Sequence, residues 1–402
     1  MTDPARADQP PAHANSDRTA SDIAEAERGS GGREGASADA AMREEAVALA
    51  QRLVRLDTRA GGERQAADLV AEILTDAGYR VRVDEPVEGR ANLVARYGSG
   101  KDDVTFTGHL DTVPARESEW SFDPMSGDIR DGRLLGRGSS DMKAGVAAQV
   151  AAAVRHVREG ADGPQLVFTF GEETGCDGAA HLDPAGLRPA ALLIVAEPTG
   201  NRIVLGHKGA LWLRATARGV SAHGSRPELG SNAIAALAGA ALRVHGHDGW
   251  PAHPAVGQAT VNVGTFHSGV QPNLVPDHAE MCLDIRTVPG FGSDEAADAV
   301  ARLCGPGIEL ERLLDLPGVA TDPSEPGLGD VLETLVPGSS ALPPMYATYF
   351  TDASLLRDKL GGPAVVVYGP GDPEQAHVTD ETCSVPNIGD CAAALYRLLR
   401  SR

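Results

Sequence analysis

Residues 167–178 read VFTFGEETGCDG, and this stretch indicates how the chain folds. Apolar residues with high β-propensity fill its first half, which is typical of a buried strand in a parallel sheet covered by helices. Two carboxylates, Glu172 and Glu173, come directly after that strand. Adjacent like charges at the end of a buried strand repel each other and resist desolvation. A turn alone does not need them, so the pair indicates a functional site at the strand end.

The composition of the whole chain is that of a folded, acidic protein. The chain has 402 residues, of which 42% are hydrophobic, and a formal net charge of −20 at pH 7. This length allows a large core and more than one domain. The negative charge argues against a nucleic-acid-binding protein and against docking on an anionic membrane. It fits a soluble enzyme that acts on a small molecule.

The cysteines and the N-terminal residues indicate the cellular compartment of the protein. The five cysteines are scattered and form no C-x-x-C pair, which predicts reduced thiols in a cytoplasmic protein. Residues 1–40 contain no aromatic residue and no apolar run of a secretory signal, so we predict a disordered N-terminal tail. No stretch approaches the roughly 18 apolar residues that span a bilayer.

Strands and helices alternate on both sides of the opening stretch. A periodic helix is predicted from about Ala41, and a second helix ends near Gly78. The strand-like runs are YRVRV, ANLVARY, DVTFTGHL, PQLVFTF, PAALLIVAE and PAVVVYG. We therefore predict an α/β fold, with a mixed, largely parallel sheet sandwiched by helices, built from residues 41–207 and 316–402.

Residues 208–315 follow a different pattern. The runs ALWLRATARG, QATVNVGTFHSG and HAEMCLDIRT alternate apolar and polar residues, which is typical of an antiparallel sheet with one solvated face. Helical periodicity separates these runs at GSNAIAALAGAALRVHG and SDEAADAVARLCG. The sequence predicts an α+β unit inserted into the larger α/β domain.

Polar side chains follow several of the predicted strands. His109 and Asp111 come just after one, Glu197 ends another, and His377 lies in a loop after a third. Asp141 stands at the start of a predicted helix, where it could also be a simple N-cap, as each histidine could be a loop residue. In open α/β sheets, ligands gather at the carboxyl ends of the strands. We expect these groups and the glutamate pair to converge there.

This set of side chains suits metal ions. Two histidines and several carboxylates without cysteine form a ligand set for Zn²⁺ or a related divalent cation. There are more groups than one tetrahedral ion needs, which indicates two metals about 3.5–4 Å apart that share a carboxylate. Beside two dications adjacent carboxylates are tolerated, so one glutamate can bind metal while its neighbour takes a proton from water.

From about residue 45 onward the chain resembles the M20 family of metallopeptidases and deacylases. This family includes acetylornithine deacetylase, succinyl-diaminopimelate desuccinylase, aminoacylase-1 and carboxypeptidase G2. The resemblance rests on GHLDTVP, GRGSSDMKAG, GEETG, AEPT, GVSAHGSRPELGSNAI, GVQPNLVPDHAEMCLDIR and GPGDPEQAHVTDE, in the family's order. It implies a zinc-exopeptidase-like catalytic domain, and an inserted unit at 208–315 that acts as a lid and dimerisation domain.

The resemblance also implies roles for the metal ligands. His109 and Glu197 would hold one metal, Glu173 and His377 the other, and Asp141 would bridge the two. The peptide after Asp141 is often cis in this family.

Other residues would take part in catalysis. Glu172 would be the general base that deprotonates a water held by the metals, and Asp111 would orient His109. His223 resembles the histidine that reaches the neighbouring subunit's active site and stabilises the oxyanion.

The implied substrate contacts are Arg286, Asn273 and Thr351. Arg286 would grip the substrate carboxylate, for which a guanidinium fork is suited. Asn273 could also be a turn residue, Arg286 an exposed strand residue, and Thr351 with Asp352 an ordinary helix cap. The other histidines are expected to be surface or helix residues, with His207 at the predicted domain junction.

The resulting prediction is a dinuclear metal-dependent amidohydrolase that cleaves a small N-acyl amino acid, on the acetylornithine deacetylase side of the family. Zinc is the first choice of metal, with cobalt or manganese as alternatives, and the protein is expected to form a homodimer through the lid. A dipeptidase or carboxypeptidase of the same architecture is the alternative. A non-catalytic descendant that binds a ligand is a remote alternative, because all the implied metal ligands and Glu172 are present in the sequence.

Overall fold

The computed structural model describes residues 20–59, 61–98 and 103–402. Residues 42–402 form one compact unit, and the residues up to Ala41 form a separate one. Helix α1 covers Ala20–Val54. Of the tail predicted to be disordered, residues 1–19 lie outside the described residues, and residues 20–40 are helical instead. Helix propensity does not account for this difference, because the segment contains Ala, Glu and Arg but also four glycines, Gly29, Gly31, Gly32 and Gly35.

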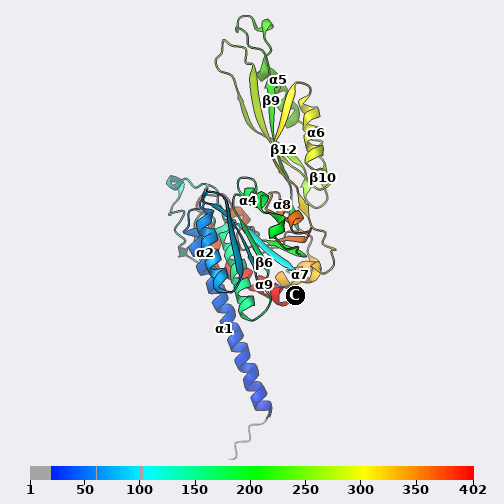
Figure 1. Cartoon of the computed structure of the whole chain (residues 1–402). Coiled ribbons are helices and arrows are strands. Elements are labelled where there is room, and N and C mark those ends of the chain that lie inside the picture. Colours follow the sequence, from blue (N-terminus) through cyan, green and yellow to red (C-terminus); the bar gives the residue numbers. More distant parts are fainter. Residues whose placement is uncertain (1–19, 60, 99–102) are drawn as a thin grey trace, which may run out of the picture. The chain divides into compact units, whose positions relative to one another are not determined.

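A six-stranded sheet with the order β1-β2-β6-β3-β7-β16 forms the centre of the larger unit (Figure 1). Its strands are β1 (Arg80–Val87), β2 (Arg90–Arg96), β3 (Val104–His109), β6 (Gln165–Thr169), β7 (Leu192–Val195) and β16 (Ala364–Val367). β3 is parallel to β6 and β7, and β16 is parallel to β7, whereas β2 is antiparallel to β1 and β6. The predicted mixed, largely parallel sheet is confirmed, and the carboxyl ends of β6, β3, β7 and β16 meet at one edge.

Helices cover both faces of this sheet. Alternate strand residues point to opposite faces, so Phe106 and Leu166 belong to one buried cluster while Val167 and Val195 belong to another. The first cluster also contains residues of α1, α2 (Glu63–Asp76), α3 (Ala144–Arg158), α7 (Leu328–Leu335) and α9 (Val385–Arg400). The second contains residues of α4 (Asp177–His181) and α8 (Ala353–Lys359). Burial on both faces explains why these strands read as continuous apolar runs.

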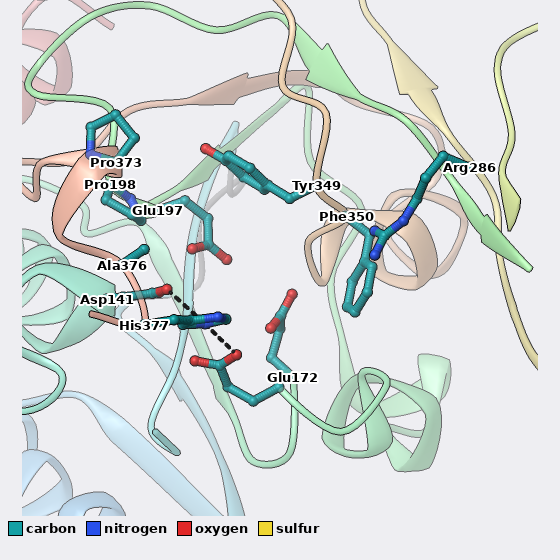
Figure 2. Close-up of a pocket in the computed structure, with 11 residues that line it drawn as sticks. Asp141, Glu172, Glu197, Pro198, Arg286, Tyr349, Phe350, Pro373, Ala376 and His377 are labelled. Atoms are coloured by element: carbon teal, nitrogen blue, oxygen red, sulfur yellow. Dashed lines mark ion pairs between the residues drawn. The ribbon is translucent and has the colours of Figure 1, made fainter. Parts of the chain in front are cut away.

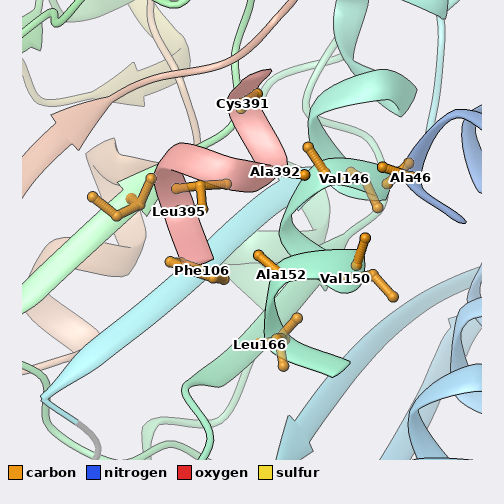
Figure 3. Packing of buried hydrophobic residues seen from close by; sticks show 14 of the residues in the cluster. Ala46, Phe106, Val146, Val150, Ala152, Leu166, Cys391, Ala392 and Leu395 are labelled. Atoms are coloured by element: carbon orange, nitrogen blue, oxygen red, sulfur yellow. The ribbon is translucent and has the colours of Figure 1, made fainter. Parts of the chain in front are cut away.

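The helix α3 packs closely against the sheet because its residues are small. Figure 3 shows Val146 and Ala152 of α3 near Phe106 and Leu166 of the sheet, with Leu395 of α9 in the same cluster. At the start of α3, a Cβ on Gly145 would lie only 2.2 Å from the carbonyl oxygen of Ala196. This close approach sets the helix that follows Asp141 directly against the end of β7.

A second, four-stranded antiparallel sheet has the order β12-β13-β9-β14. Its strands are β9 (Ala210–Arg218), β12 (Thr260–Ser268), β13 (His278–Arg286) and β14 (Ile308–Leu316), and its helices are α5 (Ala233–His245) and α6 (Ser293–Cys304). The helices and one face of the sheet share a separate buried cluster (Figure 1). These elements lie between Ala210 and Leu316.

The chain enters and leaves this second sheet at neighbouring points. A Cβ on Gly209, just before β9, would lie 2.5 Å from the carbonyl oxygen of Leu316 and 2.6 Å from the backbone nitrogen of Gly318. The two crossings therefore run backbone against backbone, which only glycine permits at such distances.

The remaining described strands form small sheets. They are β4 (Ile129–Arg130), β5 (Arg133–Leu135), β8 (Gly206–His207), β10 (Ala252–His253), β11 (Gly257–Gln258), β15 (Val319–Ala320) and β17 (Thr382–Ser384). All five cysteines are free, as predicted. Within the described residues, no helix combines the length and the apolar character that crossing a bilayer would take.

Candidate metal centre

Four polar side chains meet at the carboxyl edge of the large sheet. His109 is the last residue of β3, Glu173 lies in the turn after β6, Glu197 follows β7, and His377 lies in the loop after β16. Because these four strands are adjacent and parallel, their ends bring the side chains to one place, where Figure 2 shows Glu197 and His377. His377 adopts a left-handed backbone conformation with φ 64°.

Asp141 lies between the two histidines. It belongs to the short irregular segment η2 (Ser139–Lys143), which precedes α3, and the peptide bond from Asp141 to Met142 is cis, as expected. Oδ1 of Asp141 is 3.2 Å from Nε2 of His109, and Oδ2 is 3.4 Å from Nε2 of His377. Each carboxylate oxygen thus faces a different histidine, which is the arrangement that a bridging ligand needs.

The glutamates complete two groups around Asp141. Oε2 of Glu197 is 3.9 Å from Nε2 of His109, while Oε2 of Glu173 is 2.8 Å from Nε2 of His377. Donor atoms of His109, Asp141 and Glu173 lie within 4.8 Å of one another, as do those of His109, Glu172 and Glu197. We call these six residues (His109, Asp141, Glu172, Glu173, Glu197 and His377) the His–carboxylate cluster.

Asp111 organises this cluster from behind. Its carboxylate oxygens accept hydrogen bonds from the backbone N–H groups of Glu172 and Glu173, at 3.2 and 3.1 Å. The Nδ1 atom of His109 lies 3.0 Å from the backbone oxygen of Asp111 and 3.5 Å from Oδ1. Donation from Nδ1 leaves the Nε2 lone pair free to bind a cation. One aspartate therefore fixes His109 and both glutamates.

The protonation behaviour of the cluster shows an excess of negative charge. Burial and the carboxylate of Asp141 raise the pKa of Glu173 and of Glu197, and burial together with Glu197 raises the pKa of Glu172. Hydrogen bonds to Asp141 and Glu173 raise the pKa of His377 to about 10. Buried like charges of this kind favour either protons or metal cations as partners.

The donor set therefore fits divalent cations. It consists of imidazole nitrogens and carboxylate oxygens, the ligands that Zn²⁺, Co²⁺ and Mn²⁺ share. The buried Oε1 atom of Glu173 has no hydrogen-bond partner among the described residues, so it is free to bind a cation.

A cavity of about 250 Å³ opens above the cluster. The cluster residues Asp141, Glu172, Glu173, Glu197 and His377 line it, together with Pro198, Arg286, Tyr349, Phe350, Pro373 and Ala376. Figure 2 shows Arg286 and Phe350 on one side of the cavity and Pro198, Pro373 and Ala376 on the other.

Of the predicted substrate contacts, Arg286 reaches this cavity. Its guanidinium group lies 5.5 Å from the centre of the Phe350 ring and 3.0 Å from Oδ2 of Asp284. Thr351 is buried beside the cavity instead of lining it, and its hydroxyl lies 3.0 Å from Nε2 of His207.

His223 and Asn273 are exposed and are absent from the described lining of the cavity. They are close to each other, because the N–H of Gly224 donates to the backbone oxygen of Asn273 at 2.7 Å.

Several residues around the site had no role in the sequence analysis. Tyr349, Phe350, Pro198 and Ala376 line the cavity within two residues of a residue that the motifs did single out, and Pro373 lines it four residues before His377. Glu381 is fully buried and accepts hydrogen bonds from the backbone of Gly138, Ser140 and Asp141. It lies within the motif GPGDPEQAHVTDE, but its partners are more than two hundred residues away in sequence.

The chain is similar to proteins of one family along most of its length. The model of peptidase family M20/M25/M40 matches residues 105–401. A probable carboxypeptidase of Aspergillus terreus is 32% identical over 379 residues, covering 87% of this chain and 84% of that protein. An acetylornithine deacetylase of Vibrio parahaemolyticus is 31% identical over 343 residues, covering 80% of this chain and 87% of that protein.

Solved structures share the fold at lower identity. A tripeptidase from Staphylococcus aureus has a TM-score of 0.72 at 21% identity and covers 89% of this chain and 98% of that one. The Bacillus subtilis YXEP protein, described as a dinuclear metal binding peptidase from the M20 family, has a TM-score of 0.64 at 16% identity and covers 90% of this chain and 98% of that one. The family match, the relatives and the site together lead to one conclusion: the chain belongs to peptidase family M20/M25/M40, a family of metal-dependent hydrolases.

Proposed function

We propose that this protein is a dinuclear metal-dependent amidohydrolase that removes the acyl group from a small N-acyl amino acid. One observation carries the proposal: a single cavity holds a metal-binding cluster, an acid–base candidate and a guanidinium group. These are the three components that cleavage of an amide next to a free carboxylate requires. Figure 2 shows the side chain of Glu172 between His377 and Phe350, with Arg286 beyond Phe350.

The metal ligands follow from the two groups around Asp141. His109 and Glu197 would hold one ion, Glu173 and His377 the other, and Asp141 would bridge them. This assignment is supported by the carboxylate of Asp141, whose two oxygens lie 3.2 Å from His109 and 3.4 Å from His377. When bound, divalent ions polarise the amide carbonyl and lower the pKa of water, which makes hydroxide available near neutral pH. Zinc is the first choice, with cobalt and manganese as alternatives.

Glu172 would move the proton during the reaction. Its carboxylate takes a proton from the attacking water, and the resulting oxygen nucleophile adds to the amide carbon. The same carboxyl group then donates the proton to the amide nitrogen as the C–N bond breaks, giving a carboxylate and a free amine. Burial and Glu197 raise the pKa of Glu172, so its side chain is suited to hold the proton between the two steps.

Arg286 would bind the α-carboxylate of the substrate. Its pairing with Asp284 on the same strand holds the guanidinium group at the end of β13, where it borders the cavity. A guanidinium fork can bind a carboxylate through two parallel hydrogen bonds. Phe350, under the guanidinium group, adds a second contact that fixes its plane.

The elements between Ala210 and Leu316 would form the lid and dimerisation domain at 208–315. His223 and Asn273 are exposed and lie outside the described lining of the cavity, which supports a role for them in another copy of the chain. We infer a homodimer in which His223 stabilises the oxyanion in the partner's site. Mixing inactive His223→Ala and Glu172→Gln proteins should then restore activity, because one of the two sites in each mixed dimer is intact.

A carboxypeptidase or dipeptidase is the second candidate, because one of the relatives is a probable carboxypeptidase. Assays of the metal-loaded protein on N-acetyl amino acids and on dipeptides, with Zn²⁺, Co²⁺ or Mn²⁺, separate the candidates. We expect faster hydrolysis of N-acetyl amino acids. Hydrolysis of peptides alone would contradict the proposed function. A protein that binds metal and ligands but cleaves neither class would be the non-catalytic descendant.

A further inference from the structure

The cavity has two chemically different sides. The side with Arg286 and Phe350 carries a cation and an aromatic ring, whereas the opposite side is made of Pro198, Pro373 and Ala376 (Figure 2). We call these last three residues the proline wall. Among the described residues that line the cavity, every carboxylate belongs to the His–carboxylate cluster, and Arg286 is the one cationic side chain outside it.

The position of Glu172 assigns the two sides to the two halves of the substrate. Glu172 returns its proton to the leaving nitrogen, so the amine half has to lie on the side of Glu172. Figure 2 shows Glu172 between His377 and Phe350, with Arg286 beyond Phe350, so an amino acid whose carboxylate reaches Arg286 would place its nitrogen near Glu172. The acyl half then extends past the cluster to the proline wall.

The proline wall cannot compensate a charge. Proline has no backbone N–H, and the side chains of Pro198, Pro373 and Ala376 have no polar atoms. Pro373 and Ala376 are half-buried, so a charged group placed against these side chains would lose part of its hydration without gaining a hydrogen bond from them. The cluster offers no compensation either, because two divalent cations would balance the four carboxylates of Asp141, Glu172, Glu173 and Glu197.

We infer that the proline wall is an acyl subsite that selects short, uncharged aliphatic acyl groups and rejects both free α-ammonium and acyl carboxylate groups. The inference rests on the proposed function and deepens it, because it excludes dipeptides and succinylated amino acids as good substrates. The proline wall bounds this side of a cavity of about 250 Å³, so we expect short acyl groups to fit best.

Substrates of matched shape test the subsite. N-propionyl-methionine and alanyl-methionine differ at the carbon next to the scissile carbonyl, which carries a hydrogen in the first and an ammonium group in the second. N-(4-methylpentanoyl)-methionine and N-succinyl-methionine differ at the end of the acyl chain, which is an isopropyl group in the first and a carboxylate in the second. We expect kcat/KM to be at least about tenfold higher for the uncharged member of each pair. Equal or reversed ratios with active enzyme overturn the acyl subsite while the amidohydrolase proposal stands. Absence of turnover with every N-acyl amino acid overturns the proposed function, and the subsite with it.

A charge placed in the wall gives a second test. Pro373→Glu adds a carboxylate to the acyl side, and Pro373→Gln is its uncharged control of equal size. The ratio of kcat/KM for alanyl-methionine to that for N-propionyl-methionine should rise about tenfold in the glutamate variant relative to the glutamine variant. Identical ratios in the two variants would overturn the assignment of Pro373 to the acyl subsite.

Binding gives a readout that does not depend on turnover. In the metal-loaded Glu172→Gln protein, calorimetric titration should give a dissociation constant for N-propionyl-methionine at least about tenfold lower than for alanyl-methionine. Ala376→Leu should weaken binding of N-butyryl-methionine more than that of N-acetyl-methionine, because the larger side chain shortens the subsite. Tighter binding of the dipeptide, or equal losses for both acyl lengths, would overturn the inference.

Discussion

The carboxylate of Glu381 accepts hydrogen bonds from the backbone N–H groups of Ser140 and Asp141, at 2.7 and 3.0 Å. The same carboxylate accepts from the N–H of Gly138 and pairs with Arg137 at 2.7 Å. Glu381 is fully buried, and its one carboxylate accepts hydrogen bonds from most of the backbone N–H groups in the segment that leads into Asp141. Asp141 thus owes its position to a residue near the end of the chain.

Glu381→Gln is expected to destabilise the protein by about 3 kcal/mol, because it removes the charge opposite the buried Arg137. It should also lower metal affinity, since Asp141 is no longer held in place. Urea unfolding and metal analysis measure the two effects. The exposed Glu374→Gln is the control and should change neither. Wild-type stability of the Glu381 variant would contradict the role given to this carboxylate.

Glu172→Gln should keep bound metal and lose activity by about 100- to 10,000-fold, the usual contribution of a general acid–base group. Glu173→Gln, one residue away, should instead lose metal, because Glu173 contacts His377 at 2.8 Å. Metal content and kcat measured on both variants distinguish the two roles. Loss of metal from the Glu172 variant would mean that Glu172 is a ligand, which its grouping with His109 and Glu197 also permits.

Removal of metal is expected to lower the free energy of unfolding. The buried carboxylates of Glu172, Glu173 and Glu197 repel each other, and cations that bind only the folded state add about 2.7 kcal/mol at a concentration of one hundred times Kd. Thermal unfolding with and without a chelator measures the difference. In a His109→Ala variant the chelator should have a much smaller effect. An unchanged melting temperature for the wild-type protein would argue against a structural contribution from bound metal.

The buried His207 should make the protein less stable in acid. Its Nδ1 atom lies 2.9 Å from the backbone oxygen of Lys208, and its Nε2 atom lies 3.0 Å from the Thr351 hydroxyl. Burial lowers the pKa of His207 from 6.5 to about 4. Between these values the unfolded chain binds a proton that the folded protein does not, so stability falls as the pH drops, by about 3 kcal/mol in total.

His207→Gln removes this titration while keeping a polar side chain. The difference between the free energies of unfolding at pH 7 and pH 4.5 should therefore be smaller in the variant than in the wild-type protein. An equal difference in both proteins would show that other groups cause the acid sensitivity.

Gly371→Ala should damage the site through backbone packing. A Cβ on Gly371 would lie 2.2 Å from the backbone oxygen of Ser140 and 2.8 Å from Cβ of Pro198. The loop that carries His377 would have to move, which we expect to cost about 1–3 kcal/mol of stability and to reduce activity. Gly329→Ala is the control, because no atom of the described chain lies within 4 Å of its new methyl group. Gly329 lies in helix α7, so this change should be neutral or slightly stabilising in thermal unfolding.

The strands of the large sheet and the convergence of the metal ligands could be predicted from local sequence. A buried parallel strand is apolar on both faces, and its end is marked by the first polar residues, as at His109 and Glu197. The antiparallel sheet likewise followed from alternation, as in β13, where every second residue is buried. In both cases a short stretch contains the complete signal.

The surroundings of the site could not be predicted in this way. Glu381 acts on Asp141 across 240 residues, and nothing in its own neighbourhood indicates a buried carboxylate. Thr351 follows Phe350 directly, yet Phe350 lines the cavity while Thr351 points to His207. Such details depend on the direction of a single side chain in the folded protein. The helix at residues 20–40 could not be predicted either, because the Gly, Ser and Asp residues of this segment lower its helix propensity.

The neighbouring crossings at Gly209 and Gly318 have a consequence for how this protein could be rebuilt. The start of β9 and the end of β14 lie next to each other, where the chain enters and leaves the antiparallel sheet. Joining them by a short turn would yield a shortened polypeptide whose large sheet keeps its connectivity. The antiparallel sheet and its helices can also be exchanged as a unit between relatives, because both junctions of the exchanged segment lie at one place in the structure.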